Sequence, residues 1–275
     1  APRSDAFAVK PYWYDISNYL LEPLDITSGR SKQLENHETG TAEFLIDNSN
    51  GYFDTETLQG SFGATYLEAA NTGVNYVSTP DAAVNSLTGD IDIKVKVALT
   101  DWTPAAAQTL LSKWTSSGNQ RSWSFYVSTD GKLHLKWSDT GVVTVFDEVS
   151  TVATGFADGA IRWVRVHLDV VNGANHVVTF YTSSDATNDY SEVTWTQLGT
   201  TVTTLLNTSI FNSTAPILAA AEDLGATQRA AGSFYELSVF STIGSLVPAF
   251  EMSFQLGWGL GGVTAKDPAG ATWTL

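Results

Sequence analysis

The stretch Ile91-Asp92-Ile93-Lys94-Val95-Lys96-Val97-Ala98-Leu99 decides the fold class. Apolar side chains alternate in it with polar or small ones. This period of two is typical of a β-strand, because successive side chains point to opposite faces of a sheet. The pattern predicts one buried face and one face in water. Asp90 and Asp92 would then share the wet face as solvated acids.

The same alternation recurs along the chain. Asp130-Gly131 is a tight-turn signal between two such stretches and predicts a β-hairpin, and Asn172-Gly173 ends a third stretch. No long segment of period 3.6 lies among the strands, so the sequence predicts an all-β antiparallel sandwich. The sequence also allows short helical turns at 104–111 and 68–71. The other predicted strands are 122–128, 133–137, 164–170, 178–180, 195–198 and 234–240.

Strand patterns also predict which large side chains are buried and which face outward. His134 and His167 alternate with apolar residues and are expected on outer faces. Four tryptophans fall at strand positions where packing in the core is expected, namely Trp123, Trp137, Trp163 and Trp195.

The first 60 residues differ from the rest. They carry a dense aromatic cluster that includes Tyr12, Trp13, Tyr14 and Tyr19. We place a boundary near residue 60, which divides the chain into 1–60 and 61–275. About 60 residues are marginal for independent folding. We therefore expect 1–60 to be a small β-rich segment that buries these aromatics against a partner, where Tyr and Trp are enriched.

Composition excludes several classes of function. The chain has 275 residues, a net charge of −15 and no cysteine, so disulfides, thiolate metal sites and a cysteine nucleophile are excluded. Its acidity disfavours nucleic acid and anionic lipid as partners. No stretch approaches the roughly 18 apolar residues that a membrane helix needs. The opening Ala1-Pro2-Arg3 has no apolar run behind it, so we expect a cytosolic product without a secretory signal.

The N-terminal segment resembles that of minor tail proteins of tailed bacteriophages, especially those that infect actinobacteria. The resemblance rests on motifs that recur there in this order, with Thr55 in place of a typical proline. These motifs are Gly29-Arg30-Ser31, Leu34-Glu35, Gly40-Thr41-Ala42, Leu45-Ile46-Asp47-Asn48 and Gly51-Tyr52-Phe53-Asp54.

The remainder resembles the concanavalin A-like, laminin-G-type domains of the same phage tail proteins. The resemblance implies a jelly-roll β-sandwich displayed on the virion and a docking role for 1–60. Its motifs include Asn75-Tyr76-Val77, Asp101-Trp102-Thr103-Pro104, Arg121-Ser122-Trp123, Trp163-Val164-Arg165-Val166, Trp195-Thr196-Gln197-Leu198-Gly199 and the closing Ala271-Thr272-Trp273-Thr274-Leu275.

Catalytic patterns are absent from the sequence. The adjacent acids Asp147-Glu148 and Glu222-Asp223 would point to opposite faces of a strand. A glycoside hydrolase needs two carboxyl groups about 5–10 Å apart. Asp90 and Asp92 share a face, but it is the solvent side of their strand, so they do not form such a motif. No histidine pair at helical spacing supports zinc, and no Gly-x-Ser-x-Gly turn supports a serine hydrolase. We expect a protein that is not an enzyme.

Two kinds of ligand site stay open. Calcium is the one candidate cofactor, because the loop acids Asp185, Asp189 and Asp223 offer the hard oxygen ligands that it prefers, and laminin-G-type domains often bind it. Sugars stack on exposed aromatic rings while polar groups hold their hydroxyls. The candidates for such contacts lie in loops or beside them, at Trp102, Trp258, Asn119 and Arg121.

We therefore expect a structural virion protein of a tailed phage, a minor tail protein assembled in the host cytoplasm. Its expected partners are other virion proteins, in multiple copies per particle, and a host surface glycan bound weakly. Neither nucleic acid nor a membrane is expected. The alternatives are a capsid-decorating or head-fibre protein of the same build, a glycan hydrolase and a secreted bacterial lectin.

Overall fold

The computed structural model describes residues 66–71, 76–142 and 146–253, together with the strand residues 25–27, 41–43, 264–266 and 272–274. The chain divides into two units, Ala1–Gln59 and Gly60–Leu275. In the first unit, β1 (Asp25–Thr27) pairs antiparallel with β2 (Thr41–Glu43).

Two eight-stranded sheets form the second unit, and every strand pair among the described residues is antiparallel. The first, called the β5 sheet, has the order β12 (Thr196–Gln197), β11 (Asn175–Ser183), β10 (Arg162–Asn172), β5 (Ile91–Leu99), β15 (Gly232–Phe240) and β16 (Phe250–Ser253), with β13 (Val202–Thr204) on β11 and β3 (Leu67–Ala69) on β15.

The second, called the β7 sheet, has the order β17 (Thr264–Lys266), β18 (Thr272–Thr274), β4 (Val77–Thr79), β14 (Ile217–Ala219), β6 (Gln108–Thr115), β7 (Gln120–Val127), β8 (Leu133–Trp137) and β9 (Phe146–Val149). Three short 3₁₀ turns interrupt the connections, η2 (Ala83–Asn85), η3 (Ser117–Asn119) and η4 (Asp223–Gly225).

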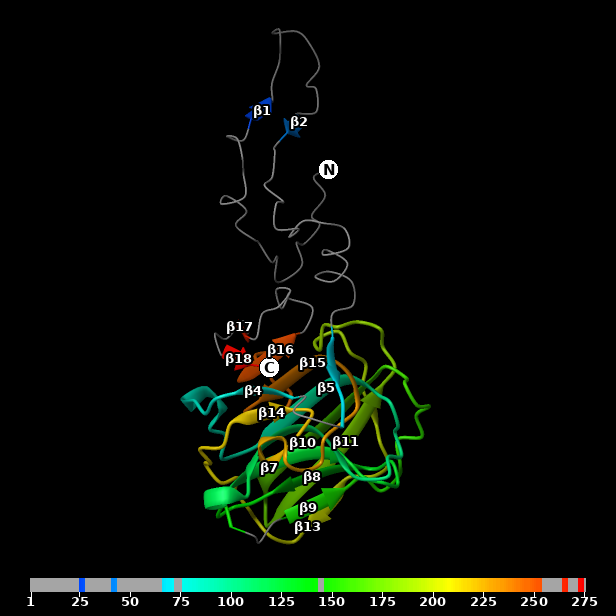
Figure 1. Ribbon diagram of the computed structural model, residues 1–275. Helices are drawn as coiled ribbons and strands as arrows, with labels where there is room; N and C mark the ends of the chain where they lie inside the picture. The colour runs from blue at the N-terminus through cyan, green and yellow to red at the C-terminus, as the bar shows by residue number, and fades with distance from the viewer. Residues whose placement is uncertain are drawn as a thin grey trace, which may run out of the picture. The chain divides into compact units, whose positions relative to one another are not determined.

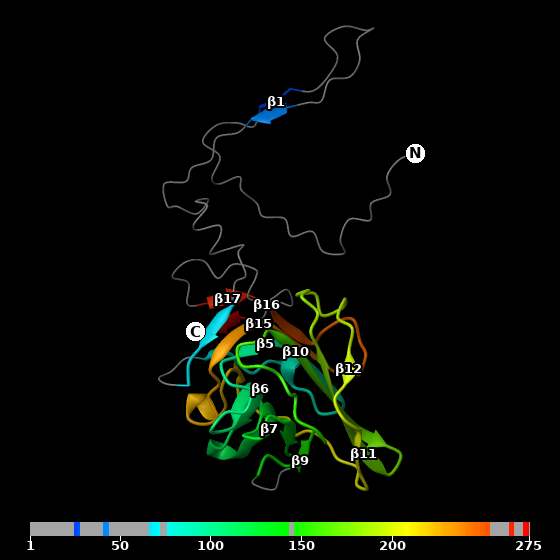
Figure 2. The ribbon, with the colours of Figure 1, turned by 90° about the vertical axis from the view of Figure 1, so that its right-hand side faces the viewer.

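Strands that are distant in sequence lie side by side in both sheets. β5 pairs with both β10 and β15, which follow it by more than one intervening strand (Figures 1 and 2). The fold is an all-β antiparallel jelly-roll sandwich, as the sequence predicts. Among the described residues, no helix has the length and apolarity needed to cross a membrane.

The hydrophobic core lies between the inner faces of the two sheets. Ile91, Ile93, Val95 and Val97 supply it from β5, where they occupy alternate positions. Trp123 and Trp137 are fully buried in the same core, and Trp163 is fully buried in a smaller second cluster, so these three predictions are confirmed. Trp195 is only partly buried and packs against the second cluster.

The two short segments that allowed a helical turn, 104–111 and 68–71, contain strand residues and no helix. Residues 108–111 belong to β6, and 67–69 form β3. The sequence of β6 does not show the regular alternation of a strand, because its register shifts between Thr109 and Leu111, as at a β-bulge. Two consecutive leucines, Leu110 and Leu111, therefore both enter the core.

The predicted wet face of β5 is the clearest correction. Asp92, Lys94 and Lys96 alternate with the core residues as expected, but all three are buried. The expectation that Asp92 is a solvated acid is therefore wrong. A second layer of chain must cover the outer face of the β5 sheet, because buried charges need partners.

Gly232 opens β15 at a point of close backbone approach to β5. Its φ is +146°, and a Cβ atom added there would lie 2.2 Å from the carbonyl oxygen of Ala98 and 2.8 Å from the Cα of Leu99. Only glycine fits this position, because both the conformation and the space exclude a side chain.

We expect Gly232→Ala to lower the free energy of unfolding by at least about 2 kcal/mol, because the β15–β5 pairing would have to shift. Chemical denaturation measures this. Gly89→Ala is the matched control, since a Cβ atom at Gly89 meets nothing within 4 Å. Equal effects of the two substitutions would contradict the assigned close approach.

Candidate functional site

The outer face of the β5 sheet carries polar and aromatic side chains in rows across its central strands. The pairing of β10, β5 and β15 fixes which residues are neighbours. The rows are Trp163–Lys96–Glu236, Arg165–Lys94–Ser238 and His167–Asp92–Phe240. A row of this kind brings together residues that are far apart in the sequence, which is how a sheet builds a site.

Residues 184–195, called here the covering segment, lie over the first row. The Lys96 Nζ donates hydrogen bonds to the carbonyl oxygens of Ala186 and Thr187, at 2.6 and 2.9 Å, and to Oδ1 of Asn188 at 2.6 Å. The Trp163 indole also donates to the Thr187 carbonyl, at 2.9 Å. The ammonium thus replaces water with three oxygens, and the segment is fixed on the sheet.

Aromatic packing fixes the same segment further along. Tyr190 stands edge-on to Phe240, with ring centroids 5.3 Å apart. The Lys94 Nζ lies 4.2 Å from the Phe240 ring centroid and 5.2 Å from that of Tyr190, within the range of cation–π contact. The buried charge of Lys94 therefore has an aromatic environment rather than a solvated one.

Arg165 forms the most specific contact of this face. Its Nε and Nη2 donate to the two carboxylate oxygens of Asp92 at 2.8 and 2.7 Å, a bidentate pair. The guanidinium carbon also lies 5.1 Å from the Tyr181 ring centroid and 5.5 Å from that of Trp195. We call Arg165, Tyr181 and Trp195 the Arg165 slot.

Arg165 in the slot is partly exposed to solvent, whereas the Asp92 that holds it is buried. The side chain of Arg165 is 13% exposed and that of Asp92 is fully buried. Tyr181 and Trp195 are half-buried. A cation held rigidly between two partly exposed rings can pack against an apolar ring face and donate hydrogen bonds beside it.

His167 extends the slot along β10. Its ring stands edge-on to Tyr181 with centroids 5.2 Å apart, and its Nε2 lies 3.5 Å from the Tyr181 hydroxyl. Burial lowers the pKa of the imidazole, and the Arg165 guanidinium lowers it further. His167 is on the outer face of its strand, as the sequence predicts, and adds a neutral polar ring there.

Glu236 is the buried acid of the first row. Burial raises the pKa of its carboxyl well above the usual 4.5, and a hydrogen bond from Ser253 opposes this rise. The neighbouring carboxylate of Glu251 on β16 raises the pKa further. Glu236 is therefore neutral in the folded protein well above the pH at which an exposed glutamate ionises.

We expect this acid to make the protein less stable as the pH rises. The unfolded chain releases the Glu236 proton near pH 4.5, whereas the folded protein holds it to higher pH, so stability falls between the two values. Glu236→Gln mimics the protonated acid and does not lose this stability. In this pH window, its free energy of unfolding relative to that of the native protein should therefore rise by up to about 1.4 kcal/mol per pH unit.

Denaturant midpoints measured across this pH range test the expectation. Glu192→Gln, at an exposed acid of the covering segment, is the matched control and should follow the native protein. A difference between Glu236→Gln and the native protein that stays constant with pH would show that Glu236 is ionised in the fold.

The structure places Trp102 away from any ligand surface. Its indole is fully buried, stands edge-on to Phe156 at 4.9 Å and donates to the carbonyl oxygen of Ala160 at 3.3 Å. It therefore offers no ring face to a sugar. Trp258 lies outside the described residues, as do the expected docking residues Tyr12, Trp13, Tyr14 and Tyr19.

Arg121 and Asn119 do come together, although not beside the Arg165 slot. Arg121 is on β7, in the other sheet, and its Nη1 donates to Asn119 Oδ1 at 3.1 Å and to the Gly141 carbonyl at 3.3 Å. Both groups serve a local turn in this arrangement. Their role in ligand binding remains a prediction.

Each of the three calcium candidates accepts a hydrogen bond from a backbone amide, and the donor to Asp223 lies far away in the sequence. Asp185 accepts a hydrogen bond from the Thr194 amide, Asp189 from the Ser191 amide and Asp223 from the Ser116 amide. Within the described residues, no group of three or more acids or histidines gathers as metal ligands would.

Sequence reasoning missed the slot itself. The alternation of Arg165 and His167 with apolar residues on 164–170 was a usable signal, since it places both on one outer face. Trp195 was expected in the core, and Tyr181 carried no signal. The register of β10 and β11, which pairs Arg165 with Tyr181, brings one ring to the arginine, and the covering segment brings Trp195.

No protein-family model and no curated protein matches the chain. Solved structures with a similar fold include CBM40 of the Ruminococcus gnavus IT-sialidase bound to α2,3-sialyllactose, at 14% identity and a TM-score of 0.42, covering 66% of this chain and 90% of its own. Domains LG4-5 of the mouse laminin α1 chain show 14% identity and a TM-score of 0.42, over 72% and 44%.

The SAP-like pentraxin of Limulus polyphemus shows 13% identity and a TM-score of 0.39, over 64% of this chain and 74% of its own. At such identities a likeness concerns the fold alone. The resemblance of the N-terminal motifs to phage minor tail proteins is not tested by these neighbours.

Proposed function

We propose that the β-sandwich is a non-enzymatic glycan-binding module of a tailed-phage virion protein, a minor tail protein whose residues 1–60 dock onto the particle. The observation that supports glycan binding is the Arg165 slot, in which a fixed guanidinium lies within 5.5 Å of the centroids of two half-buried aromatic rings. The virion role rests on the resemblance of the N-terminal motifs.

The slot matches the surface of a sugar ring in chemistry. A sugar has an apolar face of C–H groups, which packs on aromatic rings, and a rim of hydroxyls, which accept hydrogen bonds. Tyr181 and Trp195 supply the rings. Because Asp92 engages Nε and Nη2 of Arg165, the guanidinium is held in place, and Nη1, which has no acceptor among the described residues, would donate to a hydroxyl.

The surrounding face favours binding over hydrolysis. Glu236 and Glu251 sit on neighbouring strands, but both are buried, and Tyr190 of the covering segment hydrogen-bonds Glu251. A single shallow slot would bind a glycan weakly. Many copies on one particle would convert this weak affinity into firm attachment.

Trp195→Ala should reduce glycan affinity at least about tenfold, because stacking of a ligand ring on one aromatic side chain is worth roughly 1–3 kcal/mol, the range known for nucleic-acid bases. Binding of the full chain to a panel of bacterial surface polysaccharides measures this. Tyr66→Ala, at an exposed tyrosine outside the slot, is the matched control. If Trp195→Ala binds as well as the native protein, the slot is not the glycan site. If the native protein binds no polysaccharide of the panel, the proposed glycan binding is wrong.

The docking role of the N-terminal segment has its own test. A chain that lacks residues 1–56 should fold as a sandwich but fail to enter particles, because the docking aromatics are gone. Incorporation is measured on purified particles, with full-length Trp195→Ala as the control that should still incorporate. Incorporation of the shortened chain would refute the assignment, and imaging the position of the full chain would separate tail from capsid decoration.

A further inference from the structure

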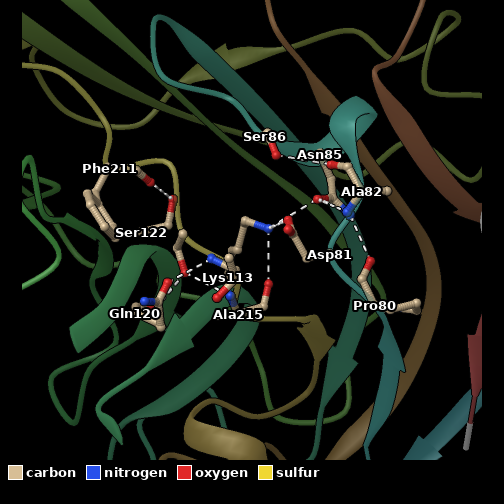
Figure 3. A network of polar contacts seen from close by, with 12 residues as sticks. Pro80, Asp81, Ala82, Asn85, Ser86, Lys113, Gln120, Ser122, Phe211 and Ala215 are labelled. Atoms are coloured by element: carbon tan, nitrogen blue, oxygen red, sulfur yellow. Dashed lines mark hydrogen bonds and ion pairs between the residues drawn. The ribbon is translucent and has the colours of Figure 1, made fainter. Parts of the chain in front are cut away.

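A buried lysine outside the Arg165 slot lies against an asparagine and an aspartate (Figure 3). Lys113 of β6 pairs in register with Ile217 and Trp123, both core residues, and is 1% exposed. Its Nζ lies 2.5 Å from Asp81 Oδ1 and 3.1 Å from Asn85 Oδ1. A buried amine and a buried carboxamide thus meet a carboxyl group that reaches solvent.

The carboxamide of Asn85 is held in a single orientation. Asn85 is 1% exposed, and its Oδ1 accepts a second hydrogen bond, from the backbone amide of Ala82, at 3.1 Å. Its Nδ2 donates to the Pro80 carbonyl at 3.1 Å. The Ala82 amide therefore polarises the C=O bond of Asn85, as a donor of an oxyanion site polarises an acyl group, while the second donor to Oδ1 is the lysine itself.

The lysine is suited to act as a nucleophile. Burial lowers the pKa of Lys113, although Asp81 opposes the shift. Desolvation favours the neutral amine, which is the nucleophilic form. Asp81 is the group that can take the proton, and its side chain is 30% exposed and in direct contact with Nζ.

We propose that Lys113 and Asn85 join in an intramolecular isopeptide bond, with Asp81 as the acid–base group. The Lys113 ammonium transfers one proton to the Asp81 carboxylate, and the amine lone pair attacks Cγ of Asn85. Negative charge develops on Oδ1 beside the Ala82 amide. A second proton passes from the attacking nitrogen through Asp81 to Nδ2, the Cγ–Nδ2 bond breaks, and ammonia leaves with the remaining proton as ammonium. No oxidant or other reactant is consumed.

The bond would fasten the segment that contains η2 to the core strand β6. It closes a loop of 28 residues, which restricts the unfolded chain as a disulfide does. Reductants do not break an amide. The inference is independent of glycan binding, since the two sites share no residue.

Intact-mass measurement of the full chain tests the proposal directly. The expected mass is one ammonia below that of the sequence, and digestion should yield a branched peptide that joins Lys113 to Asn85. The full sequence mass, with both residues in separate linear peptides, would overturn the proposal. This readout needs no variant and so does not depend on a variant's folding.

Two variants locate the reaction. Asp81→Ala keeps both reacting groups but removes the acid–base group, so it should retain the full mass and melt at a lower temperature. Asn172→Ala is the matched control, because Asn172-Gly173 can also lose ammonia by forming a succinimide. The control should keep the native mass deficit. If the deficit disappears in Asn172→Ala and persists in Asp81→Ala, the proposed bond does not exist.

Discussion

Charges removed from water must find partners, and β5 places three of them on the outer face of its sheet. Asp92, Lys94 and Lys96 lie on a central strand whose other face is the hydrophobic core. Leaving a buried charge unpaired costs about 3–5 kcal/mol, so each neighbouring element has to supply a partner. Arg165 and the covering segment meet this requirement, and the Arg165 slot is a consequence of it.

Much of the fold could be predicted from alternation alone. β5 and β8 begin and end at the residues that the pattern indicates, and β15 contains the whole of 234–240. The burial of the outer face could not be predicted, because alternation shows only that the two faces of a strand differ in polarity. The covering segment has no period, and its contacts with Lys96 are mainly through backbone carbonyls, which any residue supplies.

The candidate site was harder to predict for the same physical reason. Trp102 in its turn and Trp195 in its strand pattern suggested an exposed and a buried ring, and the structure reverses their order of exposure. Exposure of an aromatic ring depends on which distant segment packs on it. Arg165 receives the Tyr181 ring from β11 and the Trp195 ring from the covering segment. Neither contact produces a recognisable spacing of residues in the sequence.

The buried cations Arg165 and Lys113 differ in what their chemistry permits. A guanidinium delocalises its charge over three nitrogens and is a poor nucleophile, so the contact of Arg165 with Asp92 yields only an ion pair. A lysine loses its proton far more readily when buried, and Lys113 faces a polarised carboxamide. A chain without cysteine has no disulfide available to fix its fold. An amide link between Lys113 and Asn85 supplies the same restriction from groups that do not respond to the redox state of their surroundings.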